Sequence, residues 1–514
     1  MAERIGYTFS ESGHYNPEYI TVVLEADKEI AKGDLIYIDH PKNGFPVVYQ
    51  VTRVYSHKKT RTYEEALLRS GSVISDDEMM SVRAKAYQWG WMDDGYLRGL
   101  RHHLQPHSSV YRASKSIIAN FTKPAGSWKI HLGVDPSSQL EVELDTNGLV
   151  RQNCLICGAV GTGKTTTALS MVVKASRLRP SVRFFIVDKD GEYKGLLDQF
   201  GPDEVVNVPW ISLYQSDDVT LEDFLAEFGW QRSWWTAKIL DCSLKLLKTA
   251  GKRLSKDHLE KAIAIVTKDV LGFMRDDSEL RDYKMQVINA IRSSGLIPQK
   301  QTVAQNPVQL LKRYKIVIMD LSKGRNGWAD KHIVIAHALR RILNEALENR
   351  RFGCVILLEE AMYYAPQRGY FEVGTRDSRD KLLSIIREIA TNGGRNGAAL
   401  WVVTQRLATV SKTVITQCAT NTISHALEDV DKQRLGEIVG QEFIDLLGGL
   451  SQGEAIVRGS ALRCRFPVWV KVIPVMFPTS ADSTPRKRFL AMESEKLSLQ
   501  DGRKDHTDGI PLEM

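Results

Sequence analysis

The fold is decided by the stretch Cys154-Leu155-Ile156-Cys157-Gly158-Ala159-Val160-Gly161-Thr162-Gly163-Lys164-Thr165-Thr166. Four apolar residues precede the pattern G-x-x-x-x-G-K-T, and a helical run follows it, so the sequence predicts a buried strand, a glycine-rich loop and a helix. Glycines let backbone N–H groups wrap around a phosphate, and a helix N-terminus adds favourable partial charge. We therefore predict a nucleotide-binding loop at residues 158–166, with Lys164 on the β- and γ-phosphates and the Thr165 hydroxyl on Mg²⁺.

Further apolar runs that alternate with helical segments extend this unit. They are Arg183–Asp188, Ile316–Asp320, Cys354–Leu358 and Ala399–Thr404. Such alternation predicts an α/β fold with a doubly wound parallel sheet, here a RecA-like P-loop ATPase core at residues 146–217 and 299–475. The leucine- and lysine-rich residues 218–298 predict a helical insertion, and residues 476–514 a polar tail.

Residues 1–145 differ in character from the rest of the chain. β-branched runs at residues 19–24, 34–38 and 47–51, separated by glycine turns, predict a small β-barrel or sandwich. Residues 75–120 predict a helix and a basic loop, before strands at 128–132 and 140–144. His102, His103 and His107 lack a matching set of cysteines or carboxylates, so an exposed basic loop is favoured over a metal site.

Acidic residues follow two of the predicted core strands. Glu359 and Glu360 end the run that begins at Val355; Glu359 is expected to face the metal and Glu360 to act as general base. A solvated acidic pair is the alternative. Asp188 opens the stretch Asp188 to Tyr193 and is expected to assist the metal or the water, with a plain turn as the alternative.

Two polar groups flank the predicted strand at 399–404. Gln405 follows this strand, where an amide can sense the γ-phosphate or orient water. Arg395 lies before it in a glycine-rich loop, where a guanidinium can reach the γ-phosphate of a neighbouring subunit as a finger. A surface arginine is the alternative for Arg395.

Composition limits the class of protein. The chain has 514 residues, 69 Lys and Arg against 62 Asp and Glu, and a formal charge of +7, a mild bias that does not by itself demonstrate a polyanion partner. Six cysteines do not form a disulfide framework; Cys154 and Cys157 lie on a predicted buried strand and point to opposite faces, which argues against zinc. No leader-like or membrane-spanning run is present in the sequence, so a soluble cytoplasmic protein is expected.

Five stretches resemble the HerA family in identity and order. They are Gly158 to Thr165, Asp188 to Tyr193, Leu358-Glu359-Glu360-Ala361, Gly393 to Gly397 and Thr404-Gln405-Arg406. The resemblance runs nearly end to end, and the N-terminal β-zone is similar to the HAS barrel of that family. Met362 stands where the family usually has histidine, and the Gly-Arg-Lys loop of the family is Gly-Gly-Arg here. Because this shifts the finger by one residue, Arg387 and Arg151 are alternatives to Arg395.

The resemblance implies a homohexameric ring that hydrolyses ATP with Mg²⁺ and moves duplex DNA without reading its sequence. It also implies a NurA-type nuclease or another effector on the barrel face, in DNA end resection or antiviral defence. Candidate DNA-tracking residues are Arg368, Arg376, Arg379, Lys248, Lys252 and Arg253. A secretion or conjugation ATPase and an ATP-regulated scaffold ring are the alternatives, which DNA-stimulated turnover would separate.

Overall fold

The computed structural model describes residues 3–10, 16–25, 27–58, 80–93, 96–101, 104–105, 107–122, 128–213, 219–252, 254–271, 277–297, 305–322, 327–370, 372–463 and 467–476. Three residues discussed above, His102, His103 and Arg253, lie outside these ranges. The predicted polar tail also lies outside them, apart from Met476.

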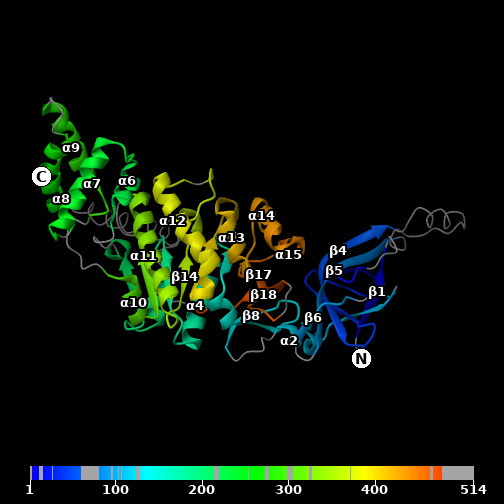
Figure 1. The fold of residues 1–514 in the computed structure, drawn as a ribbon. Helices are drawn as coiled ribbons and strands as arrows, with labels where there is room; N and C mark the ends of the chain where they lie inside the picture. The colour runs from blue at the N-terminus through cyan, green and yellow to red at the C-terminus, as the bar shows by residue number, and fades with distance from the viewer. Residues whose placement is uncertain are drawn as a thin grey trace, which may run out of the picture.

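A closed β-barrel forms the N-terminal end of the molecule (Figure 1). The described strands of this sheet are β1 (Arg4–Phe9), β2 (Tyr19–Leu24), β3 (Leu35–Asp39), β4 (Pro46–Lys58), β5 (Met80–Asp93), β6 (Tyr96–Arg98), which extends β5 outside the closed ring, and β7 (Ser109–Arg112). They run in the order β2-β1-β7-β3-β4-β5-β6, and β2 also pairs with β5, which closes the barrel. Inward side chains such as Ile5, Val22 and Val51 form its core, which confirms the predicted barrel.

The remaining described strands of the chain form a second sheet. Its described strands are β8 (Lys129–Val134), β9 (Glu141–Asp145), β10 (Cys154–Cys157), β11 (Phe184–Asp188), β12 (Val205–Pro209), β13 (Ile316–Asp320), β14 (Cys354–Leu358), β15 (Ala398–Thr404), β16 (Asn421–Ser424), β17 (Glu454–Gly459) and β18 (Val468–Val472). Their order is β12-β13-β11-β14-β15-β10-β16-β17-β18-β8-β9; β10 to β16 are parallel and the remaining strands are antiparallel.

Helices cover both faces of the parallel part of this sheet. The described helices are α2 (Lys115–Thr122), α3 (Thr146–Arg151), α4 (Lys164–Leu178), α5 (Leu196–Gln199), α6 (Leu221–Phe228), α7 (Trp235–Thr249), α8 (Lys256–Leu271), α9 (Asp277–Ser293), α10 (Pro307–Arg313), α11 (Trp328–Glu348), α12 (Arg376–Glu388), α13 (Lys412–Cys418), α14 (Asp429–Val439) and α15 (Gln441–Leu447). Helices α6–α9 project from the end of the molecule opposite the barrel (Figure 1), as expected for the helical insertion.

The core strands are buried on both sides, which explains their continuous apolar sequence. Cys154 and Ile156 of β10 join the core under α4, whereas Leu155 and Cys157 join the core under α11, α12 and α13. The two cysteines therefore face opposite ways, as predicted, and burial raises the pKa of both thiols, that of Cys157 to about 12.

Two sequence expectations need correction. Residues 75–120 were expected to contain a helix and a basic loop, but β5, β6 and β7 occupy much of this range, and among its described residues only those of α2 are helical. The β8–β9 hairpin was grouped with residues 1–145, but it belongs to the second sheet, where Gly133 of β8 pairs with Val472 of β18. A Cβ on Gly133 would lie 2.0 Å from the carbonyl oxygen of Lys471, so this close approach requires glycine.

The helical insertion is anchored to the core by a buried carboxylate. Asp223 of α6 is fully buried and accepts hydrogen bonds from the backbone N–H and the hydroxyl of Thr220 at 2.8 and 2.9 Å. His337 of α11 lies 3.1 Å from it, and Lys381 of α12 forms an ion pair with it. Two core helices thus hold the first helix of the insertion through one side chain.

Contacts also join the barrel to the larger unit. The Lys32 ammonium donates to the carbonyl oxygen of Gly448 at 3.1 Å, and Arg53 of β4 lies 3.4 Å from Asp445 of α15. Among the described residues, no helix combines the length and apolar composition that a bilayer crossing requires.

Candidate nucleotide site

The glycine-rich loop leads from β10 into α4, as the sequence predicts. Gly161 and Gly163 have φ angles of 75° and 111°, which glycine adopts without the steric cost that other residues meet. A Cβ on Gly158 would lie 2.6 Å from Cβ of His425, so the loop tolerates no side chain there. The Lys164 ammonium, at the start of α4, donates to the carbonyl oxygen of Ala159 at 2.9 Å. These features make a cradle of backbone around a lysine.

The other predicted loop residues line the same turn. Val160 is exposed at its tip, and the Thr162 hydroxyl donates to the carbonyl oxygen of Ala159 at 2.8 Å. Thr165 and Thr166 lie in the first turn of α4, and the Thr165 hydroxyl donates to Glu359 at 3.3 Å. Thr166 is exposed, and its carbonyl oxygen accepts from Ser170.

The acidic pair lies directly beside this loop. Glu359 follows β14 and is nearly fully buried; besides Thr165, it accepts a hydrogen bond from the Tyr193 hydroxyl at 2.5 Å. Glu360 adopts a left-handed backbone conformation with φ of 53°, which costs a residue with a side chain about 1 kcal/mol or more. One of its oxygens accepts from the Gln405 amide, and the other is buried without a partner in the described part of the chain.

Burial leaves both glutamates poorly stabilised as anions. Burial raises the pKa of Glu359 to about 8, and the neighbouring charge of Glu360 adds to this rise. The hydrogen bond from the Tyr193 hydroxyl lowers the pKa but does not outweigh burial. Burial also raises the pKa of Glu360, although Lys164 and Gln405 act in the opposite direction. Burial lowers the pKa of Lys164, while the two glutamates oppose that shift. A cation placed here would favour both carboxylates.

Asp188 holds the loop that follows β11. One of its carboxylate oxygens accepts from the backbone N–H groups of Gly191 and Glu192 at 2.8 and 3.1 Å, and the other accepts from that of Tyr193 at 3.0 Å. Burial raises the pKa of Asp188 to about 6, although these three N–H groups lower it. Both oxygens are therefore engaged with the loop that delivers Tyr193 to Glu359, and a direct role at the metal remains a prediction.

Two residues for which no role was predicted complete the site. His425 follows β16 under the glycine-rich loop, with Nδ1 2.8 Å from the carbonyl oxygen of Glu454 and Nε2 3.0 Å from the Thr167 hydroxyl. Because a carbonyl only accepts, Nδ1 carries the proton and Nε2 accepts from Thr167. Burial lowers the pKa of His425 to about 4, so the imidazole is neutral. Tyr193 ends the stretch Asp188 to Tyr193 that resembles the HerA family, and its contact with Glu359, which spans 166 residues, was not predicted.

Two of the three candidate finger arginines, Arg395 and Arg151, lie at the edge of the sheet opposite the glycine-rich loop of their own chain. Arg395 is exposed in the turn Gly394–Asn396, before the amino end of β15, whereas the loop follows the carboxyl end of the parallel neighbour β10. A strand of this length spans about 20 Å, so Arg395 lies at the opposite edge of the sheet. Arg151 ends α3 at the same edge as Arg395, and Arg387 lies on α12 with its guanidinium 3.4 Å from the Ser411 hydroxyl.

The residues present fit ATP and Mg²⁺. The cradle offers backbone N–H groups and Lys164 to phosphates, and the oxygens of Thr165 and Glu359 suit a hard cation. Among the described residues, no cluster of three or more His, Cys, Asp or Glu side chains could hold a metal. Magnesium would therefore use Thr165 and Glu359 together with phosphate oxygens and water, the arrangement common to P-loop enzymes.

Comparisons with known proteins give the same family. The family model described as "Helicase HerA, central domain" matches residues 130–342. The chain is thus similar to the HerA helicases. The "DNA double-strand break repair helicase HerA" of Sulfurisphaera tokodaii is 23% identical over 367 residues, 67% of this chain and 69% of the relative. The HerA protein of the same description from Pyrococcus furiosus is 22% identical over 417 residues, 71% of this chain and 72% of the relative.

A solved structure of VirB4 from Thermoanaerobacter pseudethanolicus matches with a TM-score of 0.49 and 15% identity, over 68% of this chain and 98% of that one. The HerA match includes the glycine-rich loop and Asp188, and the alignments to whole HerA proteins extend well beyond this central region. A glycine-rich loop, Lys164 and the buried acidic pair, together with the similarity to the HerA helicases, make the chain an ATP hydrolase.

Proposed function

We propose that this protein is an ATP-driven DNA translocase that works as a homohexameric ring on duplex DNA. The observation that carries the proposal is Glu360, a buried carboxylate near Lys164 at the carboxyl edge of the sheet, with one oxygen that has no partner among the described residues. The relatives named as double-strand break repair helicases support DNA as the substrate.

The geometry suggests how the residues divide the work. The loop N–H groups and Lys164 bind the phosphates of ATP, and Thr165 and Glu359 hold Mg²⁺, which neutralises phosphate charge when bound. Glu360 accepts the proton of the attacking water, and its raised pKa brings it closer to the value that suits a general base. Gln405 already touches Glu360, so it positions that carboxylate before hydrolysis.

The position of Arg395 supports the ring. A finger about 20 Å from its own nucleotide cannot serve that nucleotide, but a head-to-tail neighbour can receive it. A closed ring of such contacts gives every site an arginine from the next subunit, which is the arrangement we propose, with Arg387 and Arg151 as the other candidates.

The barrel is the proposed docking face for a NurA-type nuclease or another effector. Its place at the end of the molecule opposite the helical insertion leaves that face free for a partner (Figure 1). DNA end resection is the proposed pathway because the relatives carry repair names, and an antiviral effector complex is the alternative setting.

The decisive experiment is ATP hydrolysis by the purified chain with and without duplex DNA, at low and high salt. Salt-sensitive stimulation that is lost in Glu360→Gln supports the translocase. Turnover that ignores DNA at every salt concentration contradicts it and favours a partner-controlled scaffold ring or a protein-moving ATPase.

A further inference from the structure

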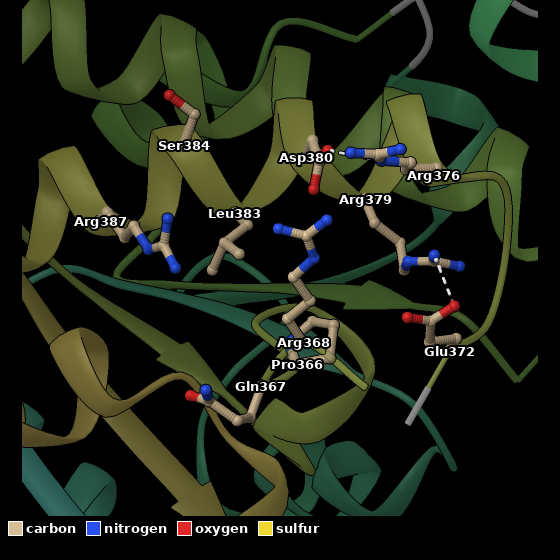
Figure 2. Close-up of a pocket in the computed structure, with 10 residues that line it drawn as sticks. All are labelled: Pro366, Gln367, Arg368, Glu372, Arg376, Arg379, Asp380, Leu383, Ser384 and Arg387. Atoms are coloured by element: carbon tan, nitrogen blue, oxygen red, sulfur yellow. Dashed lines mark hydrogen bonds and ion pairs between the residues drawn. The ribbon is translucent and has the colours of Figure 1, made fainter. Parts of the chain in front are cut away.

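A cavity lined by arginines lies next to the segment that follows the acidic pair, and of its lining residues the proposed mechanism names only Arg387, as an alternative finger. It has a volume of about 710 Å³ and lies between α12 and the segment that follows the acidic pair. Arg368 enters from this segment, and Arg376, Arg379 and Arg387 enter from α12. In Figure 2 the Arg368 side chain extends toward α12, with Arg387 and Arg379 on either side of it. We call this cavity the arginine groove.

The charge of the groove is not balanced by its own acids. Glu372 pairs with Arg379 at 3.1 Å, and Asp380 lies 3.7 Å from Arg376. No ion pair within the described ranges involves Arg368 or Arg387, although Arg387 also contacts the Ser411 hydroxyl. Four guanidinium groups around one cavity repel each other, and an anion bound between them relieves that repulsion.

The spacing of the arginines suits an extended anion. Residues 376, 379 and 387 share one face of α12 because they are three and eleven positions apart, close to whole helical turns. Eleven residues of helix span about 16 Å, and a nucleic-acid strand carries a phosphate about every 3.4 Å of its axis. A row of planar, forked guanidinium groups therefore matches several consecutive phosphates better than it matches one small anion.

The groove is connected to the catalytic glutamate through two joined segments. Pro366 forms a bridge with Val410, the backbone N–H of Gln367 donates to Thr409 at 2.7 Å, and that of Ser411 donates to Ala365 at 2.8 Å. The Gln367 side chain also accepts from the backbone N–H of Lys412 at 3.1 Å.

One of these segments begins at Glu360, and the other begins at Gln405, whose amide holds Glu360. Arg368 directly follows the joined part of the first segment, and Arg387 contacts Ser411 of the second. A ligand that draws Arg368 and Arg387 together therefore moves both segments relative to one another, and with them the contact between Gln405 and Glu360.

We propose that the arginine groove binds the sugar–phosphate backbone of DNA and that this binding adjusts the contact between Gln405 and Glu360, which couples DNA to ATP hydrolysis. The inference rests on the proposed DNA activity and adds to it the place of contact and the route of coupling. Phosphate contacts of this kind are independent of base sequence.

The test compares the full-length protein with a double variant, Arg368→Gln with Arg376→Gln. A matched control, Arg350→Gln with Arg351→Gln, removes two exposed arginines from the turn before β14, at the opposite edge of the sheet. Binding of a labelled duplex is measured over a range of salt concentrations with a non-hydrolysable ATP analogue present. The ratio of turnover with DNA to turnover without DNA is measured in parallel, and the mass of the assembly by light scattering.

The groove variant should lower the slope of log affinity against log salt by about one for each arginine removed, and the control should not. The stimulation ratio should fall at least fivefold in the groove variant. A third variant, Gln367→Ala, should keep the salt slope of the wild type and lose at least half of the stimulation, because it weakens the joined segments without removing a charge.

Failure of the inference is separate from failure of the proposed function. A wild-type protein that neither binds duplex nor responds to it contradicts the DNA activity itself. A wild-type protein that responds, with a groove variant indistinguishable from the control, overturns the groove alone. Loss of assembly mass in the groove variant also overturns it, since the arginines would then contact a neighbouring subunit.

Discussion

Two buried acidic groups in this molecule are treated in opposite ways. Asp223 in the helical insertion receives hydrogen bonds from Thr220 and is also contacted by His337 and by the ammonium of Lys381, so the fold itself supplies its partners. Glu360 is almost as deeply buried but has one partner, Gln405, and an oxygen with none in the described part of the chain. A carboxylate that supports the fold has hydrogen-bond donors for both of its oxygens. A carboxylate that binds a ligand or accepts a proton keeps one oxygen free to accept a further hydrogen bond.

The pKa values follow this difference. Burial by itself would raise the pKa of Asp223, but His337 and Lys381 outweigh it and hold that pKa well below its usual range. At the nucleotide site burial prevails, and the pKa values of Glu359 and Glu360 lie above their usual range. Four substitutions test whether Asp223 serves the stability of the fold and the nucleotide-site glutamates serve ATP hydrolysis.

The largest effect is expected for Glu360→Gln. Loss of the general base should reduce ATP turnover about 100- to 10,000-fold, because an amide cannot accept the proton of the attacking water. The measurement is steady-state hydrolysis, with nucleotide affinity as the control for an intact cradle. A reduction of less than tenfold would show that Glu360 is not the general base. The functional contrast between Glu360 and Asp223 would then be wrong.

The second effect concerns stability rather than turnover. Asp223→Ala should lower the free energy of unfolding by about 3 kcal/mol, because it leaves His337 and Lys381 without their common partner. Chemical denaturation measures this loss. Turnover per folded molecule should stay near the wild-type value; a stable variant without activity would show that Asp223 acts on the site and not on the fold.

Asp223 and Glu359, the buried neighbour of Glu360, should also respond to pH in opposite directions. The depressed pKa of Asp223 gives a stability contribution that is complete above about pH 4 and is lost as pH falls further, since the unfolded chain binds the proton more readily. The difference in stability between the wild type and Asp223→Ala should therefore narrow in acid. A difference that stays constant between neutral pH and about pH 3 would argue against the depressed pKa.

Glu359 should show the reverse behaviour in magnesium-free buffer. The raised pKa of Glu359 gives a contribution to the free energy of unfolding that is complete below about pH 4.3 and is lost as pH rises through about 8. Glu359→Gln should therefore make the fall in Tm between about pH 5 and pH 9 shallower than in the wild type, by about 2 °C or more. Differential scanning calorimetry at several pH values measures this. Parallel curves for the two proteins would contradict the raised pKa.

The smallest effect is expected for Tyr193→Phe. Removal of one hydroxyl from Glu359 should raise the Mg²⁺ concentration needed for half-maximal turnover by about tenfold, in line with the loss of a hydrogen bond to a charged group. Magnesium titration of the hydrolysis rate measures it. An unchanged requirement would show that Glu359 is oriented without Tyr193.

The sequence predicted the parts of the molecule whose chemistry is local. β10, β13 and β14 have the predicted bounds, and β11 and β15 differ from prediction by one residue at the start. Continuous apolar runs and the G-x-x-x-x-G-K-T pattern carry this information within a few residues, because a strand buried on both faces and a phosphate cradle each depend on neighbours in the chain.

Features that depend on distant partners were missed. β5 contains alanine, arginine, lysine and methionine, which favour helices, but its pairing with β4 and β2 makes it a barrel strand. His425 has no motif because its partner Thr167 lies 258 residues earlier in the chain. The placement of β8 depends on β18, with which it pairs only at residues 133–134 and 471–472.

The position of β18 between β17 and the β8–β9 hairpin has a consequence for how the protein is made. A ribosome releases β8 and β9 roughly 300 residues before β17 and β18, so the hairpin emerges long before the strand that joins it to the central sheet. β16 (Asn421–Ser424) is made only shortly before β17, so it is the edge of the hairpin that stays unpaired for long, and an unpaired strand edge favours wrong pairing. Assembly of the nucleotide domain is therefore a late, non-local event in synthesis, and a nascent chain that stalls before residue 454 carries a complete glycine-rich loop on an unfinished sheet.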